Sequence, residues 1–108
     1  GFLIDTIIKE IAVSPHQAYP ILFDWVKANH SEISMEYGSE IRKILVMRHR
    51  SQQLSCWVEW HLTAGNPAGS RLRQTMFMAP RGLLGFLSTY RWRKHHKKLF
   101  DQVLGRLT

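Results

Sequence analysis

Residues whose types could carry out chemistry are few in this sequence. Glu59 and His61 stand two positions apart in a segment that alternates apolar and polar residues, so they share one strand face. A carboxylate beside an imidazole can transfer protons or bind a metal ion. Glu59 and His61 are therefore the candidates for catalysis, but an ordinary pair of surface side chains is the favoured interpretation, so no catalytic residue is predicted.

The other histidine and cysteine positions predict structural roles. His95 and His96 are adjacent, so on a helix they point about 100° apart and do not bind one metal ion together. Cys56 falls among apolar residues and is expected in the core. A single cysteine also excludes an internal disulfide and a cysteine-based zinc site. We expect no metal and no cofactor, and we favour a binding protein over an enzyme.

Positive charge gathers in the second part of the chain. The 108 residues carry a formal charge of +7, yet residues 1–40 hold two basic and six acidic side chains. Residues 41–108 hold 13 basic and two acidic side chains, which suggests an anionic partner or a solvated surface. No nucleic-acid motif accompanies them. The candidate anion-contacting residues are Arg93, Lys94, Lys97 and Lys98.

Hydrophobic periodicity and turn residues predict a strand, a helix, a run of strands and a long final helix. The expected strands cover residues 2–13, 33–37, 41–50, 54–63 and 71–79. The expected helices begin at Ser14 and near Leu83, and Gly85 is a candidate break in the second one. Turns are predicted at Gly38-Ser39 and over Ala64–Gly69.

One face of the predicted sheet is strongly apolar. The alternation in residues 54–63 and 71–79 places nine side chains on that face, and the final helix adds an apolar stripe that Leu83, Phe86, Leu87 and Tyr90 extend. Methionine and tryptophan side chains suit a pocket that adapts to an apolar ligand, and Gln74 could orient its polar group. The alternative is a filled core. The candidate ligand-binding residues are Cys56, Val58, Trp60, Leu72, Gln74, Met76, Met78 and Leu99.

Three segments carry a resemblance to a known superfamily. Ser14-Pro15-His16-Gln17-Ala18-Tyr19 resembles the opening of START-like (SRPBCC) proteins, a group that includes polyketide cyclase-like and pollen-allergen-like members. Gly69-Ser70-Arg71-Leu72-Arg73-Gln74-Thr75 and Ala79-Pro80-Arg81-Gly82-Leu83-Leu84-Gly85 are similar to an uncharacterised bacterial family within it. The resemblance implies a helix-grip fold, in which a curved antiparallel sheet wraps a long C-terminal helix. It also implies binding of lipids or other hydrophobic ligands, with a minority of enzymes.

We therefore expect one α+β helix-grip domain over residues 1–108, shortened to about five strands from the usual seven or so. Its predicted function is to bind a hydrophobic small molecule or lipid between the sheet and the C-terminal helix. The alternatives are docking on an anionic membrane or nucleic acid through the basic helix, or a small cyclase- or hydrolase-like enzyme. We expect no nucleic-acid partner, leave peripheral membrane contact and a monomer or dimer open, and expect a cytoplasmic location without a secretory signal.

Overall fold

The chain is described by a computed structural model that covers residues 2–29, 33–37, 42–65 and 68–108. The predicted turn at Gly38-Ser39 and the middle of the turn over Ala64–Gly69 lie outside these residues. The elements follow the predicted order: β1 (Leu3–Ile11), α1 (Pro15–Asn29), β2 (Ile33–Tyr37), β3 (Arg42–Arg50), β4 (Leu54–Ala64), β5 (Ser70–Pro80) and α2 (Gly82–Leu107).

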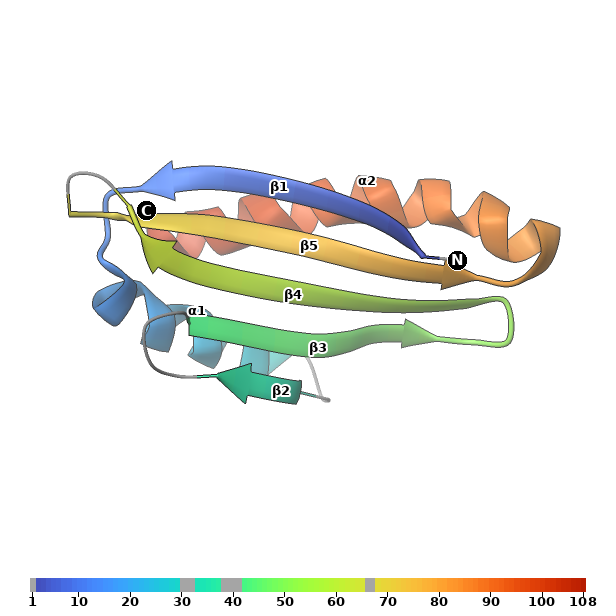
Figure 1. Ribbon diagram of the computed structural model, residues 1–108, viewed down its shortest axis with the longest axis horizontal. Coiled ribbons are helices and arrows are strands. Elements are labelled where there is room, and N and C mark those ends of the chain that lie inside the picture. The colour runs from blue at the N-terminus through green and yellow to red at the C-terminus, as the bar shows by residue number, and fades with distance from the viewer. Residues whose placement is uncertain (1, 30–32, 38–41, 66–67) are drawn as a thin grey trace.

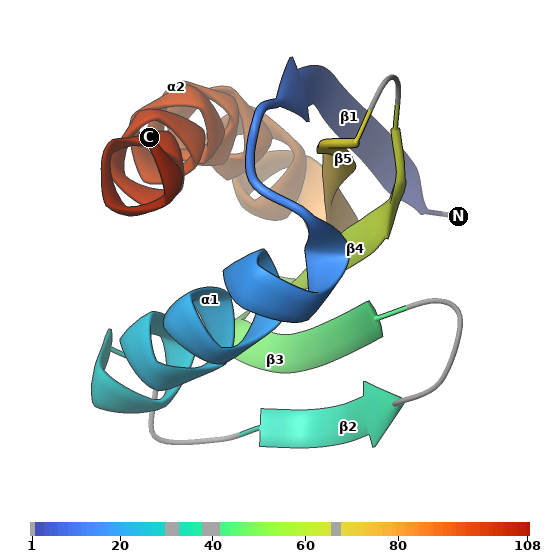
Figure 2. The same ribbon diagram turned by 90° about the vertical axis from the view of Figure 1, so that its left-hand side faces the viewer.

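The five strands form one antiparallel sheet in the order β1-β5-β4-β3-β2 (Figure 1). Seen along the strands, both helices lie on the same side of the sheet (Figure 2). Apolar side chains from that face and from the two helices form the core. The predicted α+β helix-grip arrangement, a curved antiparallel sheet packed on a long C-terminal helix, is confirmed.

Helix α1 begins where the sequence predicts. The Ser14 side-chain oxygen accepts a hydrogen bond from the Gln17 backbone N–H at 3.3 Å, which is the bond expected of an N-cap residue. Pro20 lies inside the helix without ending it. The side chains that α1 buries are Ala18, Leu22 and Val26, spaced to lie on one face.

Helix α2 is an unbroken helix of 26 residues. At a rise of about 1.5 Å per residue it is roughly 39 Å long, nearly the 45 Å length of the whole molecule. The prediction that Gly85 breaks it is wrong, because Gly85 is instead a buried contact against the Gln53 carbonyl. Among the described residues, neither helix has the length and apolar character needed to cross a bilayer.

The apolar side chains at the start of α2 are placed differently from the prediction. His96, Leu99, Val103 and Leu107 are buried against the sheet as expected. The expectation that Leu83, Phe86, Leu87 and Tyr90 extend this buried stripe is wrong, because all four are exposed. The reason is that the first turns of α2 lie past the end of β5 (Figure 1).

The corner between β5 and α2 is tied to the turn that joins β3 and β4. The Arg81 side chain donates a hydrogen bond from Nε to the Gln52 carbonyl at 2.7 Å, and its Nη2 donates to the Ser51 carbonyl. Its backbone N–H donates to the Gln53 carbonyl at 2.7 Å. Gly82 follows with a φ of 71°, a left-handed conformation that favours glycine. These contacts fix the direction in which α2 leaves the sheet.

Two glycines of α2 provide a matched test of this contact. A Cβ atom on Gly85 would overlap the Gln53 carbonyl oxygen, whereas one on Gly105 would meet no atom within 4 Å. We expect Gly85→Ala to lower the free energy of unfolding by about 1–3 kcal/mol. Gly105→Ala should instead raise it by up to about 1 kcal/mol through helix propensity. Chemical denaturation measures both, and equal effects would contradict the Gly85 contact.

Candidate ligand-binding site

The predicted ligand-binding residues come together between the sheet and α2. Strands β4 and β5 pair so that Trp60 lies beside Gln74, and Val58 beside Met76. Leu99 reaches the same core from α2. All eight predicted side chains are buried there: Cys56, Val58, Trp60, Leu72, Gln74, Met76, Met78 and Leu99.

Gln74 links two strands and the helix in the middle of this core. Its Oε1 atom accepts a hydrogen bond from Trp60 Nε1 at 2.7 Å, and its Nε2 atom donates one to the backbone carbonyl of His96 at 3.0 Å. Trp60 also packs edge-on against Trp25 of α1, with ring centroids 6.4 Å apart. The sequence predicts that the Gln74 amide orients a ligand. In the structure, this amide forms hydrogen bonds within the protein and joins β4, β5 and α2.

A buried histidine next to this link is the polar group that the sequence analysis missed. His96 Nδ1 lies 2.7 Å from Asp5 Oδ2, and the His96 side chain has no exposed surface. An ionised carboxylate only accepts hydrogen bonds, so Nδ1 carries a proton, and in the neutral imidazole Nε2 then presents a lone pair. Nε2 has no hydrogen-bond partner among the described residues. The arrangement therefore places an oriented, unused acceptor inside an apolar core.

The core around these residues is closed. A void large enough for water would give accessible surface to the side chains that line it, yet Cys56, Trp60, Gln74, Met76 and Met78 are all 0 % exposed. The sequence leaves open whether this face of the sheet lines a cavity or a filled core. Beside these residues the structure has a filled core. A ligand could enter only if core side chains or α2 moved.

Glu59 and His61 lie on the opposite face of the sheet and are held in a charged network. Glu59 contacts His61 Nε2 through one oxygen and Lys43 Nζ, at 3.1 Å, through the other. Arg73 Nη2 lies 3.0 Å from His61 Nδ1. Arginine only donates, so Nδ1 accepts and Nε2 carries the proton. Both ring nitrogens are engaged, and this geometry favours a surface pair over a catalytic one.

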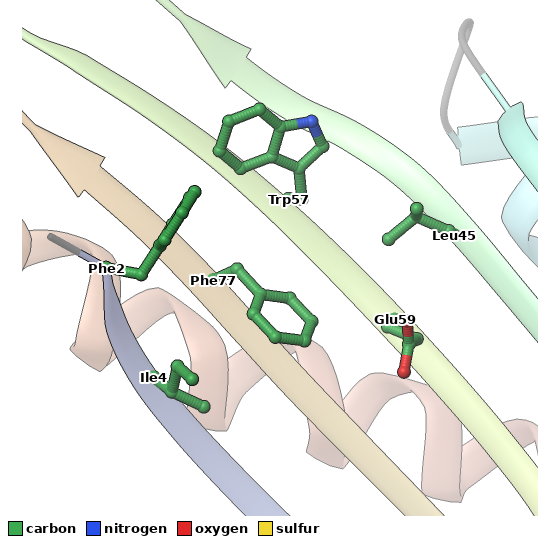
Figure 3. A pocket seen from close by; sticks show the side chains of 6 residues that line it. All are labelled: Phe2, Ile4, Leu45, Trp57, Glu59 and Phe77. Atoms are coloured by element: carbon green, nitrogen blue, oxygen red, sulfur yellow. The ribbon is translucent and has the colours of Figure 1, made fainter.

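Beside this network, the helix-free face of the sheet carries an open apolar groove of about 450 Å³. Phe2 and Trp57 form one wall, with ring centroids 6.2 Å apart. Side chains from β1, β3, β4 and β5 meet there, with α2 on the far side of the sheet (Figure 3). The groove is lined by Phe2, Ile4, Leu45, Trp57, Glu59 and Phe77.

The predicted anion-contacting residues are at the surface. Arg93, Lys94, Lys97 and Lys98 are all exposed along α2. Trp92, which directly precedes these residues, is half-buried and packs against His49 of β3, with ring centroids 5.0 Å apart. The cationic groups are thus separated from the aromatic ring that could have stacked on a nucleic-acid base.

Comparison with known proteins establishes the fold. A scan against protein-family models finds no match, and a search of curated proteins also finds none. An uncharacterised protein from Bacillus thuringiensis has a similar structure, with a TM-score of 0.54, 10 % identity and coverage of 97 % of this chain and 96 % of that one. Ara h 8.0201 aligns over 97 % of this chain and 99 % of that one with a TM-score of 0.45 and 12 % identity, too distant to carry an argument. The Bacillus protein shares the fold, and membership of the bacterial family stays a prediction.

The thiol of Cys56 reports whether the core is closed in solution. Burial raises its pKa to about 12, although the positive charge of Arg48 partly opposes the shift. The folded state thus favours the neutral thiol. That stabilisation is complete below the ordinary thiol pKa near 9 and is lost as the pH rises towards 12.

We expect alkylation of Cys56 by iodoacetamide near pH 8 to be slower by about a thousandfold in the native protein than in denaturant. Above about pH 9 the free energy of unfolding should fall more steeply for the wild type than for Cys56→Ala, by up to about 1.4 kcal/mol per pH unit. Rapid labelling of the native protein would show that the core opens readily.

Proposed function

We propose that the protein binds an apolar small molecule or lipid between the sheet and α2, and that the ligand donates a hydrogen bond to His96 Nε2. The observation that carries this proposal is the buried Nε2 atom, which has no hydrogen-bond partner in the part of the chain that the structure describes. Asp5 holds the ring through Nδ1, so that Nε2 of the neutral imidazole acts as an acceptor. The fold, which is of the helix-grip type, supports an apolar ligand in general terms.

The chemistry of Nε2 narrows the class of ligand. A buried acceptor without a partner costs about 1–3 kcal/mol, which a hydrogen-bond donor would recover. A neutral hydroxyl, amide N–H or protonated acid fits this acceptor. An ionised carboxylate has no proton to donate and would lose its own hydration. The proposed ligand is therefore a largely apolar molecule with a neutral donor at one end.

The surrounding side chains suit an adaptable site. Met76 and Met78 are unbranched and flexible, so they can repack around ligands of different shapes. Because the core is closed, ligand entry requires a shift of core side chains or of α2. A ligand that buries roughly 200 Å² of apolar surface gains about 5 kcal/mol, which offsets the cost of that shift.

A pair of ligands in which a methyl group replaces the hydroxyl hydrogen tests the role of His96. We expect 1-decanol, which can donate a hydrogen bond, to bind about tenfold more tightly than decyl methyl ether, which cannot. In His96→Leu the two affinities should become equal. Isothermal titration calorimetry measures them, and His95→Leu is the matched control because His95 is the exposed neighbour on the same helix.

The position of the site is tested by neighbouring residues that point to opposite faces of β5. Met76→Ala should change the affinity for 1-decanol, whereas Phe77→Ala, which alters only the outer groove, should leave it unchanged. Native mass spectrometry of the purified protein should also reveal a bound apolar molecule. Loss of binding in Phe77→Ala alone would move the site to the groove, and no binding of either compound would reject the proposal.

A further inference from the structure

We propose that the first two turns of α2 dock on the surface of an anionic lipid bilayer. Five large apolar side chains in this segment are exposed, and we call them the α2 tip: Leu83 (73 %), Leu84 (68 %), Phe86 (47 %), Leu87 (52 %) and Tyr90 (57 %). Single exposed apolar residues are common in soluble proteins. Five within eight consecutive residues form a contiguous patch, which marks a surface for interaction.

The charges behind the tip identify the partner. Leu83, Leu87 and Tyr90 are spaced so that they share one helical face with Lys94 and Lys97. Apolar side chains at the start of this face thus give way to basic ones further along. Between residues 81 and 100 the sequence contains no aspartate or glutamate. The helix thus has apolar side chains at its start and basic side chains in the turns that follow. This arrangement complements a bilayer whose interior is apolar and whose surface is anionic.

The dimensions of the helix match the depth of the bilayer interface. At about 1.5 Å per residue, Lys94 and Lys97 lie roughly 6 and 10 Å behind Tyr90 along the axis. Interfacial helices bury their apolar side chains about 5–10 Å into the boundary between headgroups and acyl chains. Inserted tip first, α2 would place its leucines among the acyl chains and Tyr90 at the headgroups, where tyrosine is favoured. The two lysines would then lie near the lipid phosphates.

The rest of the fold presents the tip for this contact. The first turns of α2 lie past the end of β5, so a flat surface can approach them (Figure 1). Two contacts hold the start of α2 in place. Arg81 donates hydrogen bonds to the β3–β4 turn, and Gly85 lies in close contact with Gln53. A tip already held in its binding orientation loses little conformational entropy on docking.

Two other occupants fit the tip less well. A nucleic acid would engage the basic residues but would leave the leucines in water. A second copy of the chain could cover the leucines, but it would bring two sets of Arg91, Lys94 and Lys97 near one another. This proposal does not rest on ligand binding at His96, because none of the residues of the tip belongs to that core.

Vesicle cosedimentation of the full chain tests the proposal. We expect binding to mixed phosphatidylcholine–phosphatidylglycerol vesicles to exceed binding to pure phosphatidylcholine by about tenfold or more, and to weaken as salt is added. Leu83→Ser with Leu87→Ser should reduce binding to the mixed vesicles at least about tenfold. Lys94→Gln with Lys97→Gln should reduce it by a similar factor and flatten its salt dependence.

Matched variants elsewhere on the surface serve as controls. Ile4→Ser with Ile8→Ser removes two apolar side chains of similar exposure, 58 % and 56 %, from β1. Lys9→Gln with Lys27→Gln removes the same amount of charge away from the tip. Both control pairs should change vesicle binding less than about twofold, and thermal melts confirm that each variant is folded.

Three results would overturn the proposal. Equal losses in the tip variants and their controls would show that the tip is not the contact. A dimer in the wild type that Leu83→Ser with Leu87→Ser converts to a monomer, without effect on vesicles, would assign the tip to a second copy. Binding to a DNA duplex that depends on the lysines and not on the leucines would assign it to nucleic acid. None of these results bears on the discrimination between 1-decanol and its ether.

Discussion

The buried amide of Gln74 is the constraint on which the arrangement of sheet and helix depends. An amide in an apolar core is stable only if its oxygen and nitrogen find partners. Trp60 supplies the donor from β4, and the backbone carbonyl of His96 supplies the acceptor from α2. These two hydrogen bonds hold α2 at a defined position along the sheet. In that position the His96 ring contacts Asp5 of β1.

A second contact fixes the N-terminal end of the same helix. Gly85 lies against the Gln53 carbonyl, 11 residues before His96. Eleven residues are close to three turns, so the two positions share one helical face and both meet the sheet side of the molecule. The helix cannot slide towards the centre of the sheet without losing both contacts. The exposure of the residues before and around Gly85 is therefore a consequence of how α2 is anchored.

The parts of the fold that the sequence predicts are those set by local periodicity. Alternation in β4 and β5 identifies the inward side chains, and the spacing of His96, Leu99, Val103 and Leu107 identifies the buried face of α2. Such patterns do not predict the exposure of Leu83, because that exposure depends on where β5 ends relative to the helix. Local spacing shows only which residues share a face, not what lies opposite that face.

The candidate site was only partly predictable for the same reason. Its apolar lining follows from alternation, but the partner of His96 is Asp5, 91 positions away in the sequence. Two signals were present: an acidic residue between Leu3 and Ile7 on an inward strand face, and a histidine within an apolar helical stripe. Whether the core is open or filled was not encoded in any pattern, since that depends on the summed side-chain volumes.

His61 and His96 show how partners, and not residue type, determine what an imidazole can do. His61 lies beside a carboxylate, a pairing that can transfer protons, yet Glu59 and Arg73 occupy both of its nitrogens. His96 lies within an apolar stripe that predicts only packing, yet Asp5 occupies one nitrogen and leaves the other unpartnered among the described residues. A ligand can gain a new hydrogen bond at His96, whereas at His61 it must first displace an existing one. This difference is why we propose the ligand site in the closed core and not at the more accessible pair.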